Sequence, residues 1–237
     1  MSEGLNGAAR AATRDEAEVQ PSFLVKDCAL VALATGHKAR LLQELRDELR
    51  HIDIACIYHH FWGAMLQPRF DEREYNNDFA GWVRHAMHEP VLAERLAALS
   101  PGAFTDLEGL RREIVDLIDT RLDEAEQLAW PVGSEPFEFI RSQIVVFDTN
   151  RRLQRPAELL EVRETFSLGS IFYHFIDARR RTADHADDFS DWLAAWGEEF
   201  APVRARLASI DPYFGSLGEL RTQLGRVFAQ YFREPPA

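Results

Sequence analysis

The chain has 237 residues, of which 46% are hydrophobic and 28% are charged. This balance is typical of a globular protein with a proper core. The formal net charge of −12 opposes sequence-independent binding to nucleic acid, because that binding depends on cations that neutralise phosphates. No apolar run approaches the roughly 18 residues that a membrane-spanning helix needs. We therefore expect a soluble protein whose partners include neither nucleic acid nor a membrane.

We expect no secretion signal at the start of the chain. Residues 1–20 are rich in Ala, Glu and Gly and lack an apolar core, which predicts a disordered N-terminal tail. Cys28 and Cys56 lie inside apolar runs, so without an export signal we expect two reduced core cysteines rather than a disulfide. These features predict a cytoplasmic protein.

The rest of the chain contains an internal repeat. Segment 21–61 aligns with 135–175 without a gap, at an offset of 114 residues. Identical pairs include Phe23 with Phe137, Thr35 with Thr149, Glu44 with Glu158, Ile57 with Ile171, His60 with His174, and Phe61 with Phe175. After a short gap 76–82 aligns with 186–192, and 104–118 then aligns with 214–228. Collinear matches over the whole unit predict a tandem duplication.

The repeat defines the expected organisation. The first repeat is 21–123, the connector is 124–134, the second repeat is 135–232, and 233–237 is a C-terminal tail. Equivalent parts of a duplicated protein are often related by a pseudo-twofold axis. The predicted fold is therefore mainly α, with two homologous helical repeats that pack through a shared core with pseudo-twofold symmetry.

The first element of each repeat is ambiguous. FLVKDCALVALA (23–34) suits a buried helix, whereas FEFIRSQIVVF (137–147) is β-branched and aromatic and suits a strand. A short two-stranded pairing between the repeats would reconcile the two segments. We favour an all-helical interpretation, because short apolar runs do not separate helix from strand.

The later elements have helical signals. The segment 105–127 is predicted to be a long amphipathic helix, because its apolar residues recur with a period of 3.6. A buried helix is expected around Tyr58–Phe61, and a copy of it in the second repeat. The other expected helices are 41–50, 77–88, 156–164 and 187–199.

The paired motifs carry a resemblance. IYHHF (57–61) and IFYHFIDARRR (171–181) are each followed by an Asp-Phe-x-x-Trp motif and end in a Leu-Arg helix. These strings resemble an uncharacterised prokaryotic family of tandemly duplicated proteins, catalogued only as a domain of unknown function. The resemblance covers about 22–232. It implies a duplicated fold and no particular substrate or reaction.

Two repeated histidines are the first candidates for chemistry. If His60 and His174 meet near a pseudo-twofold axis, two imidazoles could bind a ligand, transfer protons or hold a metal. The alternative is two core histidines, each bonded to a backbone carbonyl or to Asp78 or Asp188 of its own repeat. We favour this plainer alternative, in which either aspartate would orient its histidine.

A weaker metal motif lies on the helix expected at 77–88. His85 and His88 fall on adjacent turns, and with His59 or His60 they could supply a metal site. The second repeat does not conserve this pattern, so we favour a solvated helix end.

Basic residues recur beside Thr35-Gly36 and Thr149-Asn150, where Lys38 and Arg152 follow. A Thr-Gly turn with adjacent cations could hold phosphate or carboxylate. Arg179, Arg180 and Arg181 add a third cluster. The alternative is surface pairing with the many carboxylates, which contributes little to stability.

The function these residues predict is that of a non-enzymatic binding or accessory protein. It would recognise a small anionic ligand or a protein partner at the cleft between the repeats. The expected ligand-binding residues are His60, His174, Tyr58, Tyr173, Arg179, Arg180, Arg181, Lys38 and Arg152. One alternative is a metal-assisted or histidine acid/base enzyme at the same cleft, and another is a purely structural interaction scaffold. No motif requires a cofactor.

Overall fold

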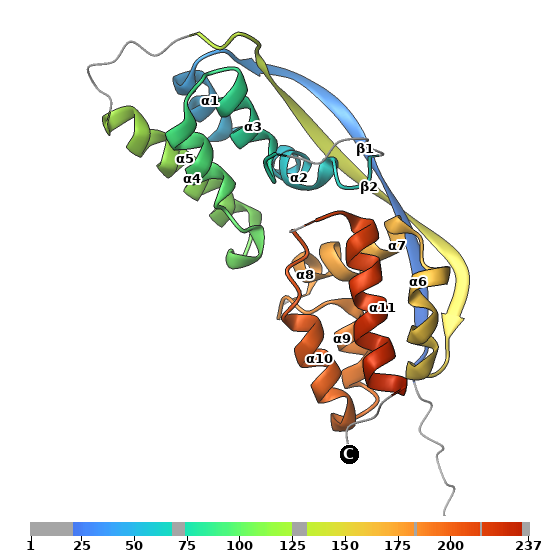
Figure 1. Cartoon of the computed structure of the whole chain (residues 1–237). Helices are drawn as coiled ribbons and strands as arrows, with labels where there is room; N and C mark the ends of the chain where they lie inside the picture. The colour runs from blue at the N-terminus through green and yellow to red at the C-terminus, as the bar shows by residue number, and fades with distance from the viewer. Residues whose placement is uncertain (1–20, 68–73, 125–131, 183, 214, 234–237) are drawn as a thin grey trace, which may run out of the picture.

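The computed structural model describes residues 21–67, 74–124, 132–182, 184–213 and 215–233. The predicted N-terminal tail, most of the predicted connector and the end of the C-terminal tail lie outside these described residues. Within them the chain is mainly helical, with a two-stranded antiparallel sheet (Figure 1). No helix in this part of the chain has the length and apolar character needed to span a membrane.

The sheet is a long ribbon of two strands, β1 (Phe23–Ala39) and β2 (Phe137–Leu153). Phe23 lies opposite Leu153, and Ala39 lies opposite Phe137. The helical interpretation of 23–34 and 137–147 is therefore wrong. The strand alternative is correct, and the pairing is much longer than the short one considered. Local composition does not decide the structure of β1, because its backbone groups pair with those of β2, between 98 and 130 residues away.

Each strand carries a bulge at its Thr-Gly or Thr-Asn dipeptide. Gly36 and Asn150 have positive φ angles of 84° and 58°, and the ladder register shifts at both places. The Thr35 hydroxyl donates to the carbonyl of Phe139 at 2.6 Å, and the Thr149 hydroxyl donates to a carbonyl of β1. The interpretation of these dipeptides as turns is therefore wrong, since both lie within strands.

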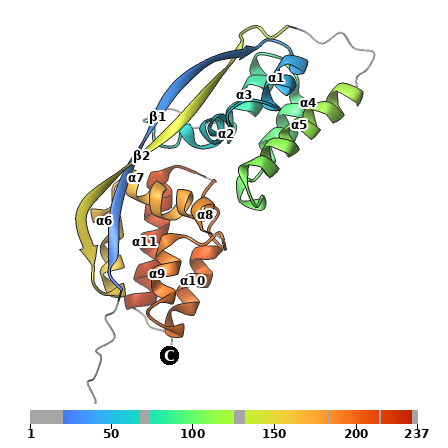
Figure 2. The same cartoon turned by 180° about the vertical axis from the view of Figure 1, so that it is seen from behind.

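Helices form two lobes beneath the ribbon. The first lobe contains α1 (Leu42–Leu49), α2 (Ile54–Tyr58), the π-helical η1 (His59–Gly63), α3 (Asp78–His85), α4 (Pro90–Ala97), the 3-10 helix η2 (Pro101–Ala103) and α5 (Leu107–Glu124). The second lobe contains the 3-10 helix η3 (Pro156–Glu161), α6 (Val162–Thr165), α7 (Leu168–Ile171), the π-helical η4 (Phe172–Asp177), α8 (Ala178–Arg181), α9 (Asp188–Ala194), the 3-10 helix η5 (Glu198–Phe200), α10 (Ala201–Ala208) and α11 (Leu217–Arg233). The ribbon arches over both lobes when the molecule is seen from either side (Figures 1 and 2).

Most of the expected helices are present, with shifted ends. The long helix predicted at 105–127 is α5, and the one predicted at 41–50 is α1. The helix predicted at 77–88 ends at His85, and the segment predicted at 156–164 begins as a 3-10 helix. Side-chain caps fix where α3 and α9 begin. The Asn77 side chain accepts a hydrogen bond from the Ala80 amide, and the Asp187 side chain accepts one from the Ser190 amide.

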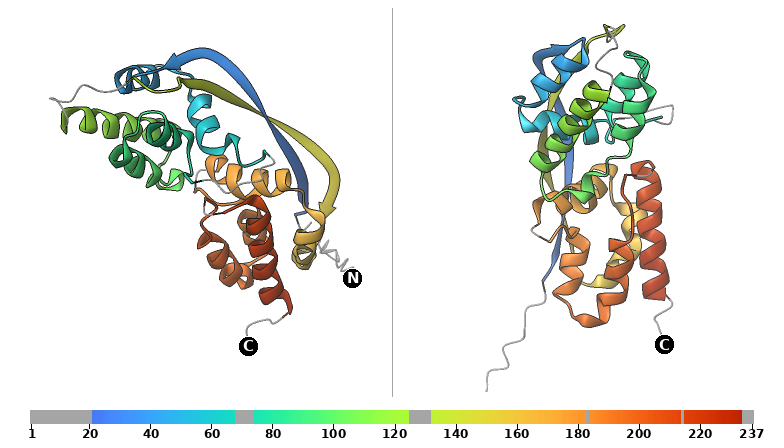
Figure 3. Two further views of the ribbon diagram at one scale, coloured as in Figure 1. Left: turned by 45° about the horizontal axis from the view of Figure 1, so that its top comes forward. Right: turned by 90° about the vertical axis from the view of Figure 1, so that its left-hand side faces the viewer.

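The ribbon crosses between the lobes, and each strand begins against one lobe and ends in the other (Figure 3). Phe23, at the start of β1, stacks on Phe189 of the second lobe at 5.3 Å between ring centroids. Phe137, at the start of β2, stacks on Phe79 of the first lobe at 5.1 Å. Because each lobe buries a strand end that comes from elsewhere in the chain, the two lobes share one hydrophobic core.

Candidate ligand-binding site between the two lobes

Two π-helical turns carry the repeated histidines of the predicted site. Turn η1 holds His60, and η4 holds His174 and Asp177. Such turns are rare and frequently occur at functional sites, because the extra residue redirects neighbouring side chains. Both turns are buried, and both touch the ribbon.

His60 is a fully satisfied buried imidazole. Its Nε2 atom lies 3.2 Å from the Ile140 amide, which can act only as a donor, so Nε2 is the acceptor. In the neutral ring the proton is then on Nδ1, which donates to Asp78 Oδ2 at 3.0 Å. Asp78 thus orients His60, and His60 holds β2 against the first lobe.

His174 has the same kind of partners in the second lobe. Its Nε2 accepts from the Lys26 amide at 2.9 Å, and its Nδ1 donates to Asp188 Oδ2 at 2.7 Å. Along β1, Lys26 is eight positions from Ala34, the cross-strand neighbour of Ile140. Eight positions of extended strand span about 26 Å. The two histidines therefore hold opposite halves of the ribbon, and the structure does not bring them together in one site.

The predicted histidine pair on α3 does not form a metal site in the structure. The helix ends at His85, whose Nε2 lies 3.0 Å from the Glu74 carboxylate. His88 lies beyond the helix with a positive φ of 55° and is exposed. The prediction that both imidazoles lie on adjacent turns of one helix is therefore wrong.

A different group has metal-ligand spacing. One ligand atom from each of His59, His60 and Asp78 lies within 4.8 Å of the others. The hydrogen bonds argue against a cation there, because both ring nitrogens of His60 already have partners. His59 Nδ1 is also 2.7 Å from the Ser142 hydroxyl. A metal on His60 Nδ1 would put a proton on Nε2, facing the Ile140 amide donor.

A buried polar contact between the lobes is centred on Asp177, which the sequence analysis did not single out. Its side chain is 1% exposed and accepts hydrogen bonds from Tyr58, Arg180 and Arg181, at 3.0, 3.0 and 2.9 Å. Tyr58 belongs to the first lobe, so this hydrogen bond joins the two lobes. The repeat hides Asp177, because it aligns with Gly63. Its spacing to the arginines, three and four residues on, is the signal that was available.

Near Asp177, burial makes proton transfer by Tyr58 and nucleophilic attack by Cys28 unfavourable. Burial, followed by the neighbouring Asp177 carboxylate, raises the pKa of the Tyr58 phenol far above its usual value. Burial likewise raises the pKa of the Cys28 thiol to about 12, with Asp177 and Asp27 adding to it. Tyr58 therefore acts as a hydrogen-bond donor, and Cys28 stays a thiol.

A cavity of about 130 Å³ lies beside Asp177, with walls from both lobes. Its aromatic lining residues are Tyr58, Trp62, Phe104 and Tyr213. Its polar lining residues are Asp177, Arg179, Arg180, His185, Asp106 and Thr105. The Trp62 ring stacks on Tyr58 with centroids 5.1 Å apart. This cavity between the lobes combines apolar rings with cations.

The three clustered arginines have different roles. Arg179 donates to the carbonyls of Leu207 and Ile210, which ties α8 to the end of α10. Arg181 is held by Asp177 and Asp188 and is not part of the cavity wall. Arg180 lines the cavity, and its side chain is 40% exposed, so it is well placed to meet an anion.

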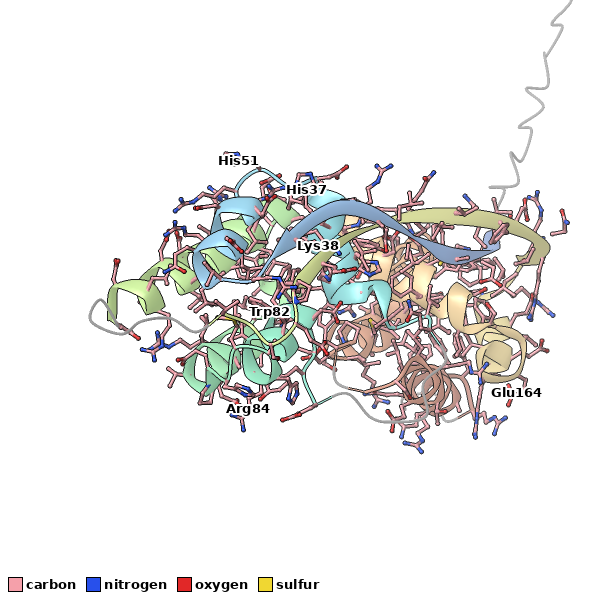
Figure 4. The ribbon with its side chains drawn as sticks, turned by 90° about the horizontal axis from the view of Figure 1, so that it is seen from above. His37, Lys38, His51, Trp82, Arg84 and Glu164 are labelled. Carbon is pink, nitrogen blue, oxygen red and sulfur yellow. The ribbon has the colours of Figure 1, made fainter. Side chains whose placement is uncertain are left out.

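The remaining predicted ligand residues lie away from the cavity. Tyr173 is buried beneath the Arg181 guanidinium, 4.2 Å from the ring centroid. Lys38 is ion-paired with Glu138 and borders an open groove with His51 (Figure 4). Arg152 is an exposed residue near the end of β2. Of the predicted ligand set, the cavity brings together Tyr58, Arg179 and Arg180.

Comparisons with known proteins place the chain in a family without assigning a reaction. Residues 20–229 match the model of a family described as "Family of unknown function (DUF5752)", so the chain belongs to this family. The solved structure of OrfY from Thermoproteus tenax is similar, with a TM-score of 0.76 and 24% sequence identity. The match covers 90% of this chain and 96% of that one, which shows a shared fold. No curated protein matches the chain.

Proposed function

We propose that this member of the DUF5752 family is a non-enzymatic binding protein that takes a small anionic ligand in the cavity between its lobes. The observation that carries the proposal is the cavity wall. Four aromatic rings from both lobes line the cavity together with Arg180, whose side chain is partly exposed. Pockets of this composition hold the apolar part of a ligand against the rings and use a few polar groups to fix its orientation.

The charges favour an anion that also carries an apolar ring. Arg180 donates to Asp177 Oδ1 through both Nε and Nη2, so a ligand would meet the guanidinium at its other amino group, Nη1. Charged hydrogen bonds from a guanidinium to carboxylate or phosphate are strong where water is excluded. The Arg180 guanidinium lies over the Tyr58 ring, 5.1 Å from its centroid, and the Trp62 ring stacks on the same tyrosine, so aromatic surface lies beside this cation.

An enzyme at the same place is the less favoured function. Acid/base catalysis by His60 or His174 would require a ring nitrogen free to exchange a proton with a substrate, yet both nitrogens of each ring are engaged. Metal catalysis would rest on His59, His60 and Asp78. If it operates, added zinc, manganese or iron will bind stoichiometrically and raise the melting temperature, and His59→Ala will abolish this effect. We expect no such rise.

The proposal includes the duplicated, pseudo-twofold architecture that the sequence predicts. Contacts at equivalent positions support it. Trp82 donates to the carbonyl of Glu135 at 2.8 Å, and Trp192 donates to the carbonyl of Pro21 at 2.7 Å. The acceptors are 114 residues apart, which is the offset of the first aligned segment. On this view the cavity lies where two homologous halves meet, which is a common location for ligand sites.

A thermal-shift screen tests the binding function. The probes are phenyl phosphate, benzoate, nucleoside monophosphates and inorganic phosphate, each added to purified full-length protein. A ligand that binds only the folded state raises the melting temperature. We expect a ring-bearing anion to give a larger rise than inorganic phosphate, and Arg180→Gln to reduce that rise.

The matched control is Arg152→Gln. Arg152 is an exposed arginine outside the cavity, so its loss removes the same formal charge without touching the proposed site. If both variants lose the ligand-induced rise in melting temperature equally, the rise comes from general electrostatic attraction and not from the cavity. A complete absence of response from every anion would overturn the proposal.

A further inference from the structure

Charged residues of both signs line the cavity between the lobes, and some of them are already engaged within the protein. Arg179 donates through both of its amino groups to backbone carbonyls of the second lobe. Asp177 accepts hydrogen bonds from Tyr58, Arg180 and Arg181. Because these partners satisfy Arg179 and Asp177, neither residue has a charged atom to spare for a ligand.

The Arg180 guanidinium keeps one amino group for a ligand. Its Nε and Nη2 atoms both donate to Asp177 Oδ1, at 3.2 and 3.0 Å. Its third nitrogen, Nη1, has no hydrogen-bond partner within the described part of the chain. The side chain is partly exposed, so this positive group lies where the cavity meets solvent.

Asp106 of the first lobe supplies a charge of the opposite sign. It precedes α5 and caps the helix, since its Oδ1 atom accepts from the Gly109 amide at 2.7 Å. Its other oxygen, Oδ2, has no partner among the residues that the structure describes. A Cβ atom on Gly109 would lie 3.4 Å from Asp106 Oδ1 and 3.7 Å from the Phe104 ring. The exposed carboxylate is therefore next to one of the aromatic residues of the cavity.

We propose that the ligand of this cavity is an aromatic α-amino acid. The inference rests on the proposed binding function and narrows its ring-bearing anion to a zwitterion. The ligand carboxylate accepts from Arg180 Nη1, and the ligand ammonium donates to Asp106 Oδ2. The ring lies against Trp62 and Tyr213, whose centroids are 6.2 Å apart.

The charges of the site favour a zwitterion over a simple anion. An anion on Arg180 would also meet the negative charge of Asp106, whereas an ammonium group turns that repulsion into attraction. A zwitterion carries no net charge, so the net charge of −12 does not repel it at long range. The cavity of about 130 Å³ is close to the size that holds a benzene ring, which leaves the charged end of the ligand near the two exposed side chains.

Isothermal titration of the full-length protein with three related compounds tests this inference. Phenylalanine carries ring, carboxylate and ammonium, phenylpropionate lacks the ammonium, and phenethylamine lacks the carboxylate. We expect phenylalanine to bind most tightly. Asp106→Asn keeps a capping side chain on α5 but removes the charge, so it should weaken phenylalanine binding about fivefold. It should not weaken the binding of phenylpropionate.

The control is Asp116→Asn, which removes the same formal charge from the exposed face of α5, outside the cavity. It should leave the affinity for phenylalanine unchanged. If Asp106→Asn lowers the melting temperature of the free protein, Asp106→Ser repeats the test with another capping side chain.

The outcomes separate this inference from the binding function on which it rests. Phenylpropionate that binds as tightly as phenylalanine overturns the zwitterion and leaves the binding of ring-bearing anions intact. If neither acid binds, the inference fails together with the proposed function. An unchanged affinity of folded Asp106→Asn for phenylalanine, or an equal loss in Asp116→Asn, overturns the role of Asp106 and with it the zwitterion.

Discussion

Single buried polar residues connect the sheet and the two lobes. His60 and His174 each accept a hydrogen bond from a strand amide and donate one to an aspartate of their own lobe. The buried Asp177 accepts hydrogen bonds from one tyrosine and two arginines. Because a buried polar group that loses its partner costs more than the bond itself contributed, these residues are the most sensitive points of the molecule.

Asp177 should be essential for stability. Asp177→Ala leaves the buried Tyr58 hydroxyl without its acceptor and leaves Arg180 and Arg181 without their shared carboxylate. We expect a loss of about 1–3 kcal/mol in the free energy of unfolding, because the buried Tyr58 hydroxyl loses its acceptor while both arginines stay partly open to water. Urea denaturation measures it. Asp116→Ala, on the exposed face of α5, is the control and should change stability by less than about 0.5 kcal/mol. A similar small change for Asp177→Ala would refute this role.

His174 should matter for the fold and not for anion binding. His174→Ala leaves the Lys26 amide without its acceptor and opens a gap beside Phe23, whose ring centroid is 4.7 Å away. The expected cost is about 2–4 kcal/mol, from the unpaired amide and the lost packing. His85→Ala, at an exposed helix end, should be nearly neutral. If the folded His174→Ala protein loses its response to ring-bearing anions, His174 belongs to the binding site after all.

At the scale of elements, close backbone packing fixes the ribbon on the second lobe. Helix α7 contacts β1 through Gly169, whose carbonyl accepts from the Cys28 thiol. A Cβ atom at residue 169 would overlap the Asp27 carboxylate and the Cys28 carbonyl. Glycine is required there because the approach leaves no room for a side chain.

Gly169→Ala should therefore push α7 away from β1. We expect a loss of about 1–3 kcal/mol, the usual cost of overpacking. The control, Gly81→Ala, lies in α3 with nothing within 4 Å of the added methyl group. It should gain about 0.5–1 kcal/mol, because alanine is the better helix former. Thermal or urea unfolding of the two variants compares them, and a stable Gly169→Ala protein would contradict this packing.

The sequence predicts local elements better than distant contacts. Helices such as α5 follow from the 3.6 period of their apolar residues, which is a local property. The strand character of β1 depends on β2, which no local window contains, so the favoured helix there is wrong. Asp177 is missed for a related reason, since its partner Tyr58 lies 119 residues away and its repeat equivalent is a glycine. The aspartate partners of His60 and His174 could be anticipated, because they lie within 18 and 14 residues.

At the scale of the whole molecule, the crossed ribbon makes the two lobes one unit and places the cavity at their junction. The first lobe supplies the stacked Tyr58 and Trp62, and the second supplies Asp177 and Arg180. We infer that a ligand bound there contacts both lobes at once and so stabilises their relative position. This would couple ligand binding to the arrangement of the lobes.

The most direct test of the binding function is a crystal structure of the full-length protein with phenyl phosphate. We expect the ring against Trp62 and Tyr213 and the phosphate on the Arg180 guanidinium, inside the cavity between the lobes. Phenyl phosphate bound only at exposed arginines such as Arg152, with the cavity free of it, would contradict the assignment of this cavity as the ligand site.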